Sequence, residues 1–158
     1  MRWSVQQDAA LSAVNRWLKA PANQVFRLFG YAGAGKTTLA RHIAESAGGD
    51  VAFAAFTGKA AHVMRQKGCA GASTIHALIY RPADESEDGE LVFALRRDAP
   101  ASKADLIIID ECSMVDGDLG RDLLSFGKPV LVLGDPAQLP PVKGGGFFTE
   151  AQPDFMLV

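Results

Sequence analysis

The sequence has little cysteine, no long apolar run and almost no net charge. Its two cysteines, Cys69 and Cys112, lack a C-x-x-C spacing and fit a reducing compartment. The longest unbroken apolar run covers the six residues Val51 to Phe56, whereas a membrane-spanning helix needs about 20. The first residues also lack the apolar core and the cleavage site of a secretion signal. We therefore expect a cytoplasmic protein with no membrane segment.

The charges nearly cancel, since 16 Lys and Arg residues stand against 18 Asp and Glu residues. No overall basic field points to nucleic acid. The distribution is uneven, because five carboxylates fall within positions 84–90 and the rest of the chain is net positive. A local basic groove is therefore compatible with the composition.

The length and composition indicate one globular domain: 158 residues, of which 48% are hydrophobic and 22% charged. The apolar pattern alternates between helical spacing and short continuous runs. This alternation predicts an α/β fold with a central, mostly parallel sheet that helices cover on both faces. The pattern predicts helices at 5–19, 37–47, 59–66 and 118–126, strands at 25–29, 51–56, 106–109 and 130–133, and a further strand beginning near 154.

Residues 81–103 break the alternation. This stretch contains the acidic run, two prolines and one alternating patch at 90–97. We interpret it as a surface insertion that forms a small hairpin.

Residues 30–37 satisfy the phosphate-binding pattern G-x-x-x-x-G-K-[ST]. Glycines let backbone N–H groups face an anion, and the positive N-terminal end of the next helix adds to the attraction. We expect Lys36 to reach the β and γ phosphates and the Thr37 hydroxyl to ligate magnesium. The alternative is a glycine-rich loop with an exposed lysine. The predicted nucleotide-binding residues here are Gly30, Gly33, Ala34, Gly35, Lys36, Thr37 and Thr38.

An apolar strand at 106–109 ends in the acidic pair Asp110 and Glu111, which is the Walker B arrangement. We expect Asp110 to hold magnesium and Glu111 to orient and deprotonate the attacking water. A kinase must keep water away from the γ-phosphate, so a glutamate placed to activate water favours an NTPase. The alternative is an ordinary solvated strand end.

A third strand, at 130–133, also runs into polar residues. Asp135 and Gln138 follow it and are expected at the carboxyl edge of the sheet, where ligands bind in open α/β folds. The alternative is a proline-stiffened turn.

These segments, read with FTGKAA at 56–61, TIHALI at 74–79 and DECSMV at 110–115, resemble the first motor domain of the RecD-like and Dda-like helicases of superfamily 1B. Five motifs occur in the family's order over nearly the whole chain. The resemblance implies a RecA-like P-loop NTPase fold and an ATP-dependent DNA helicase that moves 5′ to 3′ on single-stranded DNA. It also implies that ATP and Mg²⁺ are the ligands.

The resemblance also assigns roles to single residues. Gln7 is similar to the family's adenine-recognising glutamine, although a glutamine on a helix is often merely exposed. Gln138 resembles the residue that senses the γ-phosphate, and it joins Lys36 and Glu111 as a catalytic residue, with Asp135 supporting its loop.

Two further motifs match DNA-contacting positions. The residues that the resemblance assigns to single-stranded DNA are Thr57, Gly58, Lys59, Thr74 and His76. Structural alternatives stay open, because Thr57 to Lys59 also suit a helix cap and His76 suits a core histidine.

The family's motor has a second RecA-like domain, which supplies arginines to the ATP site, and no segment here corresponds to it. We therefore interpret residues 1–158 as motor domain 1A, with the insertion at 81–103 in the place of the strand-separating pin subdomain, although it is short and acidic. Alone, the chain is expected to bind ATP, to hydrolyse it slowly and not to unwind DNA. The alternatives are a generic AAA-type P-loop NTPase and a regulatory module that binds nucleotide without hydrolysing it.

Overall fold

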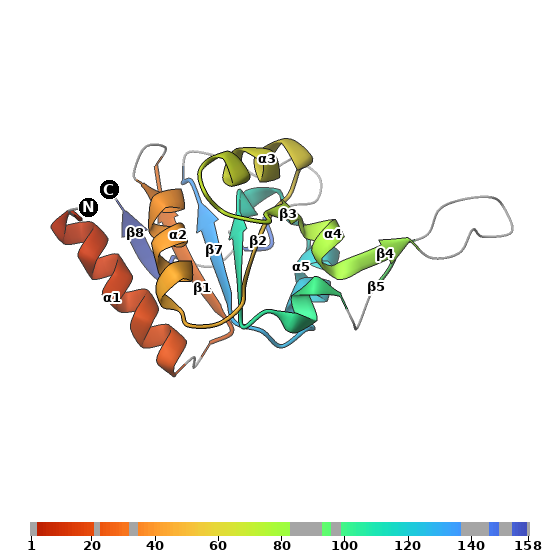
Figure 1. Ribbon diagram of the computed structural model, residues 1–158, viewed down its shortest axis with the longest axis horizontal. Coiled ribbons are helices and arrows are strands. Elements are labelled where there is room, and N and C mark those ends of the chain that lie inside the picture. Colours follow the sequence, from red (N-terminus) through yellow and green to blue (C-terminus); the bar gives the residue numbers. More distant parts are fainter. Residues whose placement is uncertain are drawn as a thin grey trace, which may run out of the picture.

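A parallel six-stranded sheet forms the centre of the molecule (Figure 1). The computed structural model describes residues 3–20, 23–31, 35–82, 93–95, 99–136, 146–148 and 153–157, with the backbone alone for 81–82 and 93–95. The helices are α1 (Val5–Lys19), α2 (Lys36–Ser46), α3 (Gly58–Gln66), α4 (Ile75–Ile79) and α5 (Gly117–Leu124), with 3-10 turns η1 (Pro100–Lys103) and η2 (Cys112–Met114). The strands are β1 (Val25–Gly30), β2 (Val51–Ala55), β3 (Ser73–Thr74), β4 (Tyr80–Pro82), β5 (Phe93–Leu95), β6 (Leu106–Asp110), β7 (Val130–Gly134) and β8 (Phe155–Leu157).

The strand order in the large sheet is β3-β2-β6-β7-β1-β8, and every neighbouring pair is parallel. Strand β7 lies between β6 and β1, with Ile109 opposite Val132 and Phe29 opposite Gly134. The carboxyl ends of β1, β6 and β7 therefore meet at one edge of the sheet, which is the edge where open α/β sheets bind ligands.

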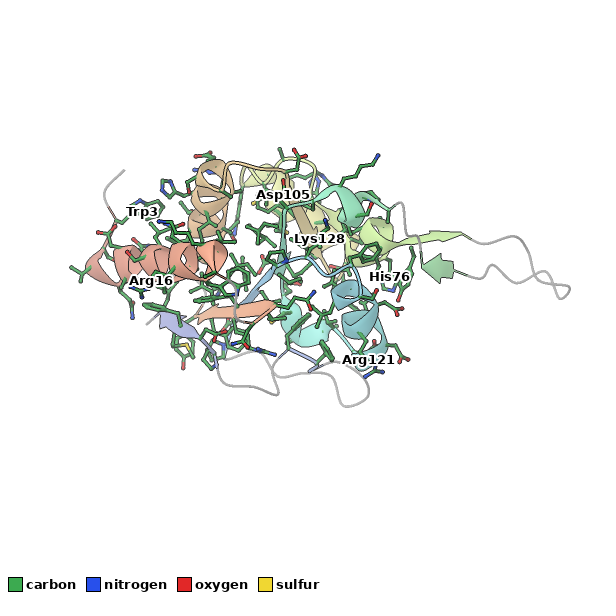
Figure 2. The ribbon with its side chains drawn as sticks, turned by 90° about the horizontal axis from the view of Figure 1, so that it is seen from below. Trp3, Arg16, His76, Asp105, Arg121 and Lys128 are labelled. Carbon is green, nitrogen blue, oxygen red and sulfur yellow. The ribbon has the colours of Figure 1, made fainter. Side chains whose placement is uncertain are left out.

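Helices cover both faces of the sheet. Buried side chains of α1, α2 and α3, among them Leu39, Ile43 and Met64, pack on one face. Leu78 of α4 and Leu123 of α5 pack on the other. Figure 2 shows α5 and the helices α2 and α3 on opposite sides of the sheet. The predicted fold class is confirmed, and the double coverage explains why the predicted strands are apolar without alternation.

The predicted helices and strands all exist, with ends shifted by at most two residues. The largest change is at α5, which stops at Leu124 and not at Phe126. Gly127 has a φ of 69° and donates its N–H to the carbonyl of Leu124 at 3.0 Å. A left-handed glycine in this position ends a helix.

The predicted insertion divides into two parts. Strands β4 and β5 pair antiparallel, with Tyr80 opposite Leu95, and point away from the large sheet in Figure 1. The expected surface location is wrong for Ala99 and Ala101, which are both fully buried, Ala101 in the core on the α5 face of the sheet. The acidic run at 84–90 lies outside the described residues.

Candidate nucleotide and DNA site

The phosphate loop, residues 30–37, connects the end of β1 to the start of α2. Gly35 is the N-cap of α2, with a φ of 84° and a ψ of 22°, in the left-handed region that glycine adopts without steric cost. Its lack of a side chain leaves the first turn of α2 without a side-chain cap, as a helix N-terminus that binds an anion requires. Gly33 and Ala34 lie outside the described residues.

The side chain of Lys36 folds back over this loop. Its ammonium group donates hydrogen bonds to the carbonyl of Gly30 and, at 3.4 Å, to that of Tyr31. Burial raises the pKa of Asp110, at the end of β6, and the charge of Lys36 opposes that rise. The structure therefore brings the lysine of the first motif and the acid of the second into one electrostatic environment. Thr37 and Thr38 are half-buried in the first turn of α2.

Gln7 lies beside the phosphate loop, although 28 positions separate it from Gly35 in the sequence. It belongs to the capping box of α1, and its side-chain oxygen accepts from the N–H of Ser4 at 2.9 Å. A Cβ atom built on Gly35 would stand only 2.9 Å from Nε2 of Gln7. The contact gives a second reason for glycine at position 35, since a side chain there would displace the amide.

The acidic pair follows the buried strand β6. One oxygen of Asp110 accepts from the N–H of Glu111 at 2.8 Å. Burial raises the pKa of Asp110, while that hydrogen bond and Lys36 oppose the rise. Burial raises the pKa of Glu111 as well, and the negative charge of Asp110 adds to the effect. Both carboxylates therefore lie in a partly desolvated site.

Glu111 has a strained backbone. Its φ is 54° and its ψ is 49°, and among the described residues no other non-glycine residue has a positive φ. A non-glycine residue keeps this conformation only where the surrounding structure imposes it, and such residues concentrate at functional sites. Residues 111–115, here called the Walker B turn, are therefore held by their neighbours.

Strand β7 ends against both motifs. A Cβ atom on Gly134 would lie 2.8 Å from the ring of Phe29 in β1 and 3.1 Å from Sγ of Cys112 in the Walker B turn. Asp135 follows and is half-buried, as expected for a residue at this edge. Gln138 lies outside the described residues.

The oxygen donors at this edge fit a magnesium ion. Mg²⁺ takes hard oxygen ligands and is usually held by one or two carboxylates together with substrate phosphates. Asp110 has a second carboxylate oxygen besides the one bonded to Glu111, and Thr37 offers a hydroxyl at the start of α2. Within the described residues, no three His, Cys, Asp or Glu side chains form a cluster that would hold a metal by themselves.

The two threonines predicted to contact DNA are both helix N-caps. Oγ1 of Thr57 accepts from the N–H of Ala60 at 3.1 Å, and Oγ1 of Thr74 accepts from the N–H of Ala77 at 3.1 Å. The capping interpretation is therefore confirmed for Thr57. It does not exclude a ligand, because a hydroxyl that accepts one hydrogen bond still has its own proton to donate. Thr57, Gly58 and Lys59 are exposed.

His76 is exposed on α4, so its interpretation as a core histidine is wrong. Its ring lies 6.3 Å from that of Phe56 and 5.6 Å from that of Tyr80, measured between centroids. Figure 2 shows His76 at the base of the β4–β5 hairpin. The sequence analysis assigns no role to Phe56 or Tyr80. Each is an aromatic residue that stands directly beside a predicted DNA motif, and this pattern would have singled them out.

The fold and the site together define a class. Phosphate loop, acidic pair and parallel sheet are those of a RecA-like P-loop NTPase domain. A family model described as an AAA domain matches residues 4–155, and the chain belongs to this family. Within this family, the chain is similar to the first RecA-like domain of RecD-like and Pif1-like helicases of superfamily 1B, which confirms the predicted resemblance to RecD-like helicases.

The comparisons behind this assignment are of two kinds. The chain is 38% identical over 125 residues to the ATP-dependent RecD2 DNA helicase of Deinococcus radiodurans, with 75% of this chain and 16% of that protein covered. It is 29% identical to Bacteroides Pif1 bound to single-stranded DNA, with a TM-score of 0.61 over 90% of this chain and 34% of that one. It is 28% identical to Bacteroides Pif1 in complex with ADP-AlF4, with a TM-score of 0.62 and the same coverage of 90% and 34%.

The chain spans between 12% and 34% of the length of the curated relatives that it matches. Within the described residues, no helix combines the length and the apolar character needed to cross a membrane.

Proposed function

We propose that this chain is the ATP-binding and ATP-hydrolysing motor domain of a DNA helicase that moves 5′ to 3′ on single-stranded DNA. The observation that carries the proposal is the meeting of two motifs at one edge of the sheet: β7 lies between β1, which leads into the phosphate loop, and β6, which ends in the acidic pair. Relatives support it, since RecD2 is named an ATP-dependent DNA helicase and solved Pif1 structures contain ADP-AlF4 or single-stranded DNA.

In this proposal the phosphate loop binds the triphosphate. The first N–H groups of α2 and the ammonium of Lys36 meet the β and γ phosphates. Thr37 and Asp110 would hold Mg²⁺, and the ion would offset the negative charge of the phosphates. Gln7, which contacts the N-cap of α2, recognises the adenine.

Glu111 acts as the general base. Burial, with the charge of Asp110, raises its pKa, which makes it a stronger base than an exposed glutamate. It takes a proton from water as the water oxygen forms a bond to the γ phosphorus. The bond from that phosphorus to the bridging oxygen breaks, and its electron pair leaves with ADP. We assign sensing of the γ-phosphate to Gln138 and support of its loop to Asp135.

Single-stranded DNA crosses the surface formed by the start of α3 and by α4. Thr57, Gly58 and Lys59 offer hydroxyl, backbone N–H and ammonium donors to phosphate oxygens, and Thr74 and His76 continue the path. The aromatic row of Phe56, His76 and Tyr80 adds faces on which bases stack.

A second RecA-like domain is the expected partner. An arginine supplied from another domain is worth roughly 10³ to 10⁵ in rate, so this chain alone hydrolyses ATP slowly. We propose that residues 1–158 are motor domain 1A and that the β4–β5 hairpin stands at the pin position. We also propose a cytoplasmic location, since Cys69 and Cys112 are both free thiols.

The test uses two variants of the purified chain. Lys36→Ala should lose ATP binding in calorimetry, because it removes the cation that meets the phosphates. Glu111→Gln should bind ATP as the parent does and lose slow hydrolysis in a single-turnover assay with protein in excess. Unchanged ATP affinity in Lys36→Ala would refute the nucleotide site, and parental hydrolysis in Glu111→Gln would refute the assignment of the base.

A further inference from the structure

A short downstream segment lies against the Walker B turn. The N–H of Gly146 donates to the carbonyl of Ser113 at 2.9 Å, and the N–H of Phe147 donates to the carbonyl of Val115 at 2.9 Å. Phe148 is fully buried on the α5 face of the sheet, and its carbonyl accepts from Nε of Arg27 at 2.8 Å. Residues 146–148 are thus attached to the Walker B turn and to strand β1 at once.

The ring of Phe147 rests on Gly120 in α5. A Cβ atom on Gly120 would lie 2.2 Å from a carbon of this ring, so no other residue fits at position 120 without moving Phe147. Glycine is unfavourable inside a helix, and here the ring packed over it gives the reason for its presence. Phe147 also packs edge-on against Phe148, with the two ring centroids 4.9 Å apart.

The Walker B turn also contacts the end of β7, where Gly134 packs against Cys112. Two contacts therefore fix the residues that directly follow Glu111. One is the packing of Gly134, and the other is the pair of hydrogen bonds from Gly146 and Phe147. A left-handed glutamate returns to the ordinary backbone region when the residues next to it are released.

We propose that Phe147, seated on Gly120, is a positioning residue for Glu111. Its ring, packed on Gly120, holds residues 146–147 in place, so that Phe147 bonds the carbonyl of Val115 and Gly146 bonds that of Ser113. The two bonds keep the Walker B turn in the conformation that directs the carboxylate of Glu111 to the phosphate loop. The inference rests on the proposed function, in which Glu111 is the base, and it assigns no contact between Phe147 and ATP.

The test substitutes alanine at two glycines of the same helix. In Gly120→Ala the new methyl group displaces Phe147. In the control Gly117→Ala the three nearest atoms all belong to the end of the exposed Arg121 side chain, which moves aside easily. Gly120→Ala should lower single-turnover ATP hydrolysis about 10- to 100-fold, the range expected for misplacement of a catalytic group by about 1 Å. Gly117→Ala should stay close to the parent, and both variants should keep the parent's affinity for ATP.

A second variant and a second measurement separate positioning from general instability. Phe147→Leu keeps an apolar side chain but removes the ring from Gly120, and it should lower hydrolysis in the same way. Adding Gly120→Ala to Phe147→Leu should lower the rate little further, because both changes act on one contact. Hydrogen exchange of the Gly146 and Phe147 amides should become faster in Gly120→Ala and not in Gly117→Ala. A purely structural role would lower thermal stability and ATP affinity together.

Glu111→Gln, measured in parallel, distinguishes a failure of the proposed function from a failure of the role proposed for Phe147. If Glu111→Gln hydrolyses ATP at the parental rate, the proposed function is wrong. If Glu111→Gln is inactive while Gly120→Ala and Phe147→Leu both turn over at the parental rate, the proposed function stands and the role of Phe147 is refuted.

Discussion

Replacing Gly134 by alanine is expected to destabilise the fold because the added methyl group has no room. Its Cβ would lie 2.8 Å from two ring atoms of Phe29 and 3.1 Å from the sulfur of Cys112. Both neighbours are buried, at 6% and 0% exposure, so neither can move aside into solvent. The substitution tests whether the ends of β1, β6 and β7 pack as closely as the site requires.

The magnitude follows from two opposing effects. Overpacking a core by one methyl group costs about 1–3 kcal/mol. Alanine also lowers the entropy of the unfolded chain, which stabilises the folded state by about 0.4–1 kcal/mol. The net loss is therefore about 1–2 kcal/mol, which corresponds to a Tm lower by about 2–8 °C for a chain of this length.

The assay is thermal unfolding followed by circular dichroism, with Gly58→Ala as the matched control. A Cβ atom on Gly58 meets no heavy atom within 4 Å, so only the entropic gain remains and the Tm should stay level or rise. Combining Phe29→Leu with Gly134→Ala should cost less than the sum of the single changes, since the smaller side chain makes room. A Tm for Gly134→Ala equal to that of Gly58→Ala would refute the close packing of β7 on the two motifs.

Three further predictions concern the site. Glu111→Gln should raise the Tm at pH 7, because burial raises the pKa of Glu111 and its ionised form is therefore unfavourable in the folded state. The gain in Tm should disappear below about pH 4, where the carboxyl is protonated in both the folded and the unfolded state. An equal gain at both pH values would contradict this cause. Replacing Lys59 and His76 together by alanine should weaken binding of a single-stranded oligonucleotide and make the binding constant less dependent on salt, while ATP affinity stays constant. Unchanged DNA affinity at matched salt would assign these residues to the scaffold. Tyr80→Phe removes a hydroxyl that donates a hydrogen bond to Asp122, and it should lower the free energy of unfolding at pH 7 by about 1 kcal/mol, measured by chemical denaturation. An unchanged free energy would mean that this hydrogen bond only replaces one to water.

The sequence predicted those parts of the fold that depend on local pattern. Strands β6 and β7 are apolar on both faces because helices cover both sides of the sheet. A strand buried on both faces appears in the sequence as a continuous apolar run. Helix α1 begins at a capping box, Ser4 with Gln7, and its bounds were predicted to the residue. The phosphate loop is equally local, since its glycines, Lys36 and Thr37 stand next to one another in the chain.

Two elements, β3 and α4, were not predicted because they are too short to show a hydrophobic period. Strand β3 has two residues and α4 has five, so hydrophobic spacing carries almost no information there. Thr74 is the N-cap of α4, whereas the sequence analysis predicts for it only a DNA contact. Both interpretations of a capping threonine use the same hydroxyl, one as acceptor and the other as donor.

Contacts between distant segments were not predictable from one sequence. Gln7 touches Gly35, and Phe147 rests on Gly120, but no spacing rule relates either pair. The sequence alone does not show why these two positions need glycine. The reason is the side chain of Gln7 or Phe147, which belongs to a distant segment and packs against the glycine. The left-handed backbone of Glu111 is also hidden from sequence analysis, because the segments that contact the Walker B turn, Gly134 and residues 146–147, lie about 20 or more positions further along the chain.

Helix α5 shows why these distant contacts matter for the chemistry. It starts two residues after the Walker B turn, where Asp116 caps it through the N–H of Leu119 at 2.9 Å. Gly120, one turn later, receives the ring of Phe147, and Asp122 accepts the hydroxyl of Tyr80 at the base of the β4–β5 hairpin. One eight-residue helix thus contacts the downstream segment and the hairpin base, and it directly follows the turn that carries the proposed catalytic base. A change on α5 that merely weakened the helix would disturb all of these places together, whereas Gly120→Ala acts first on Phe147. Comparison with Gly117→Ala, which changes the same helix by the same methyl group, therefore isolates the contact that holds Glu111.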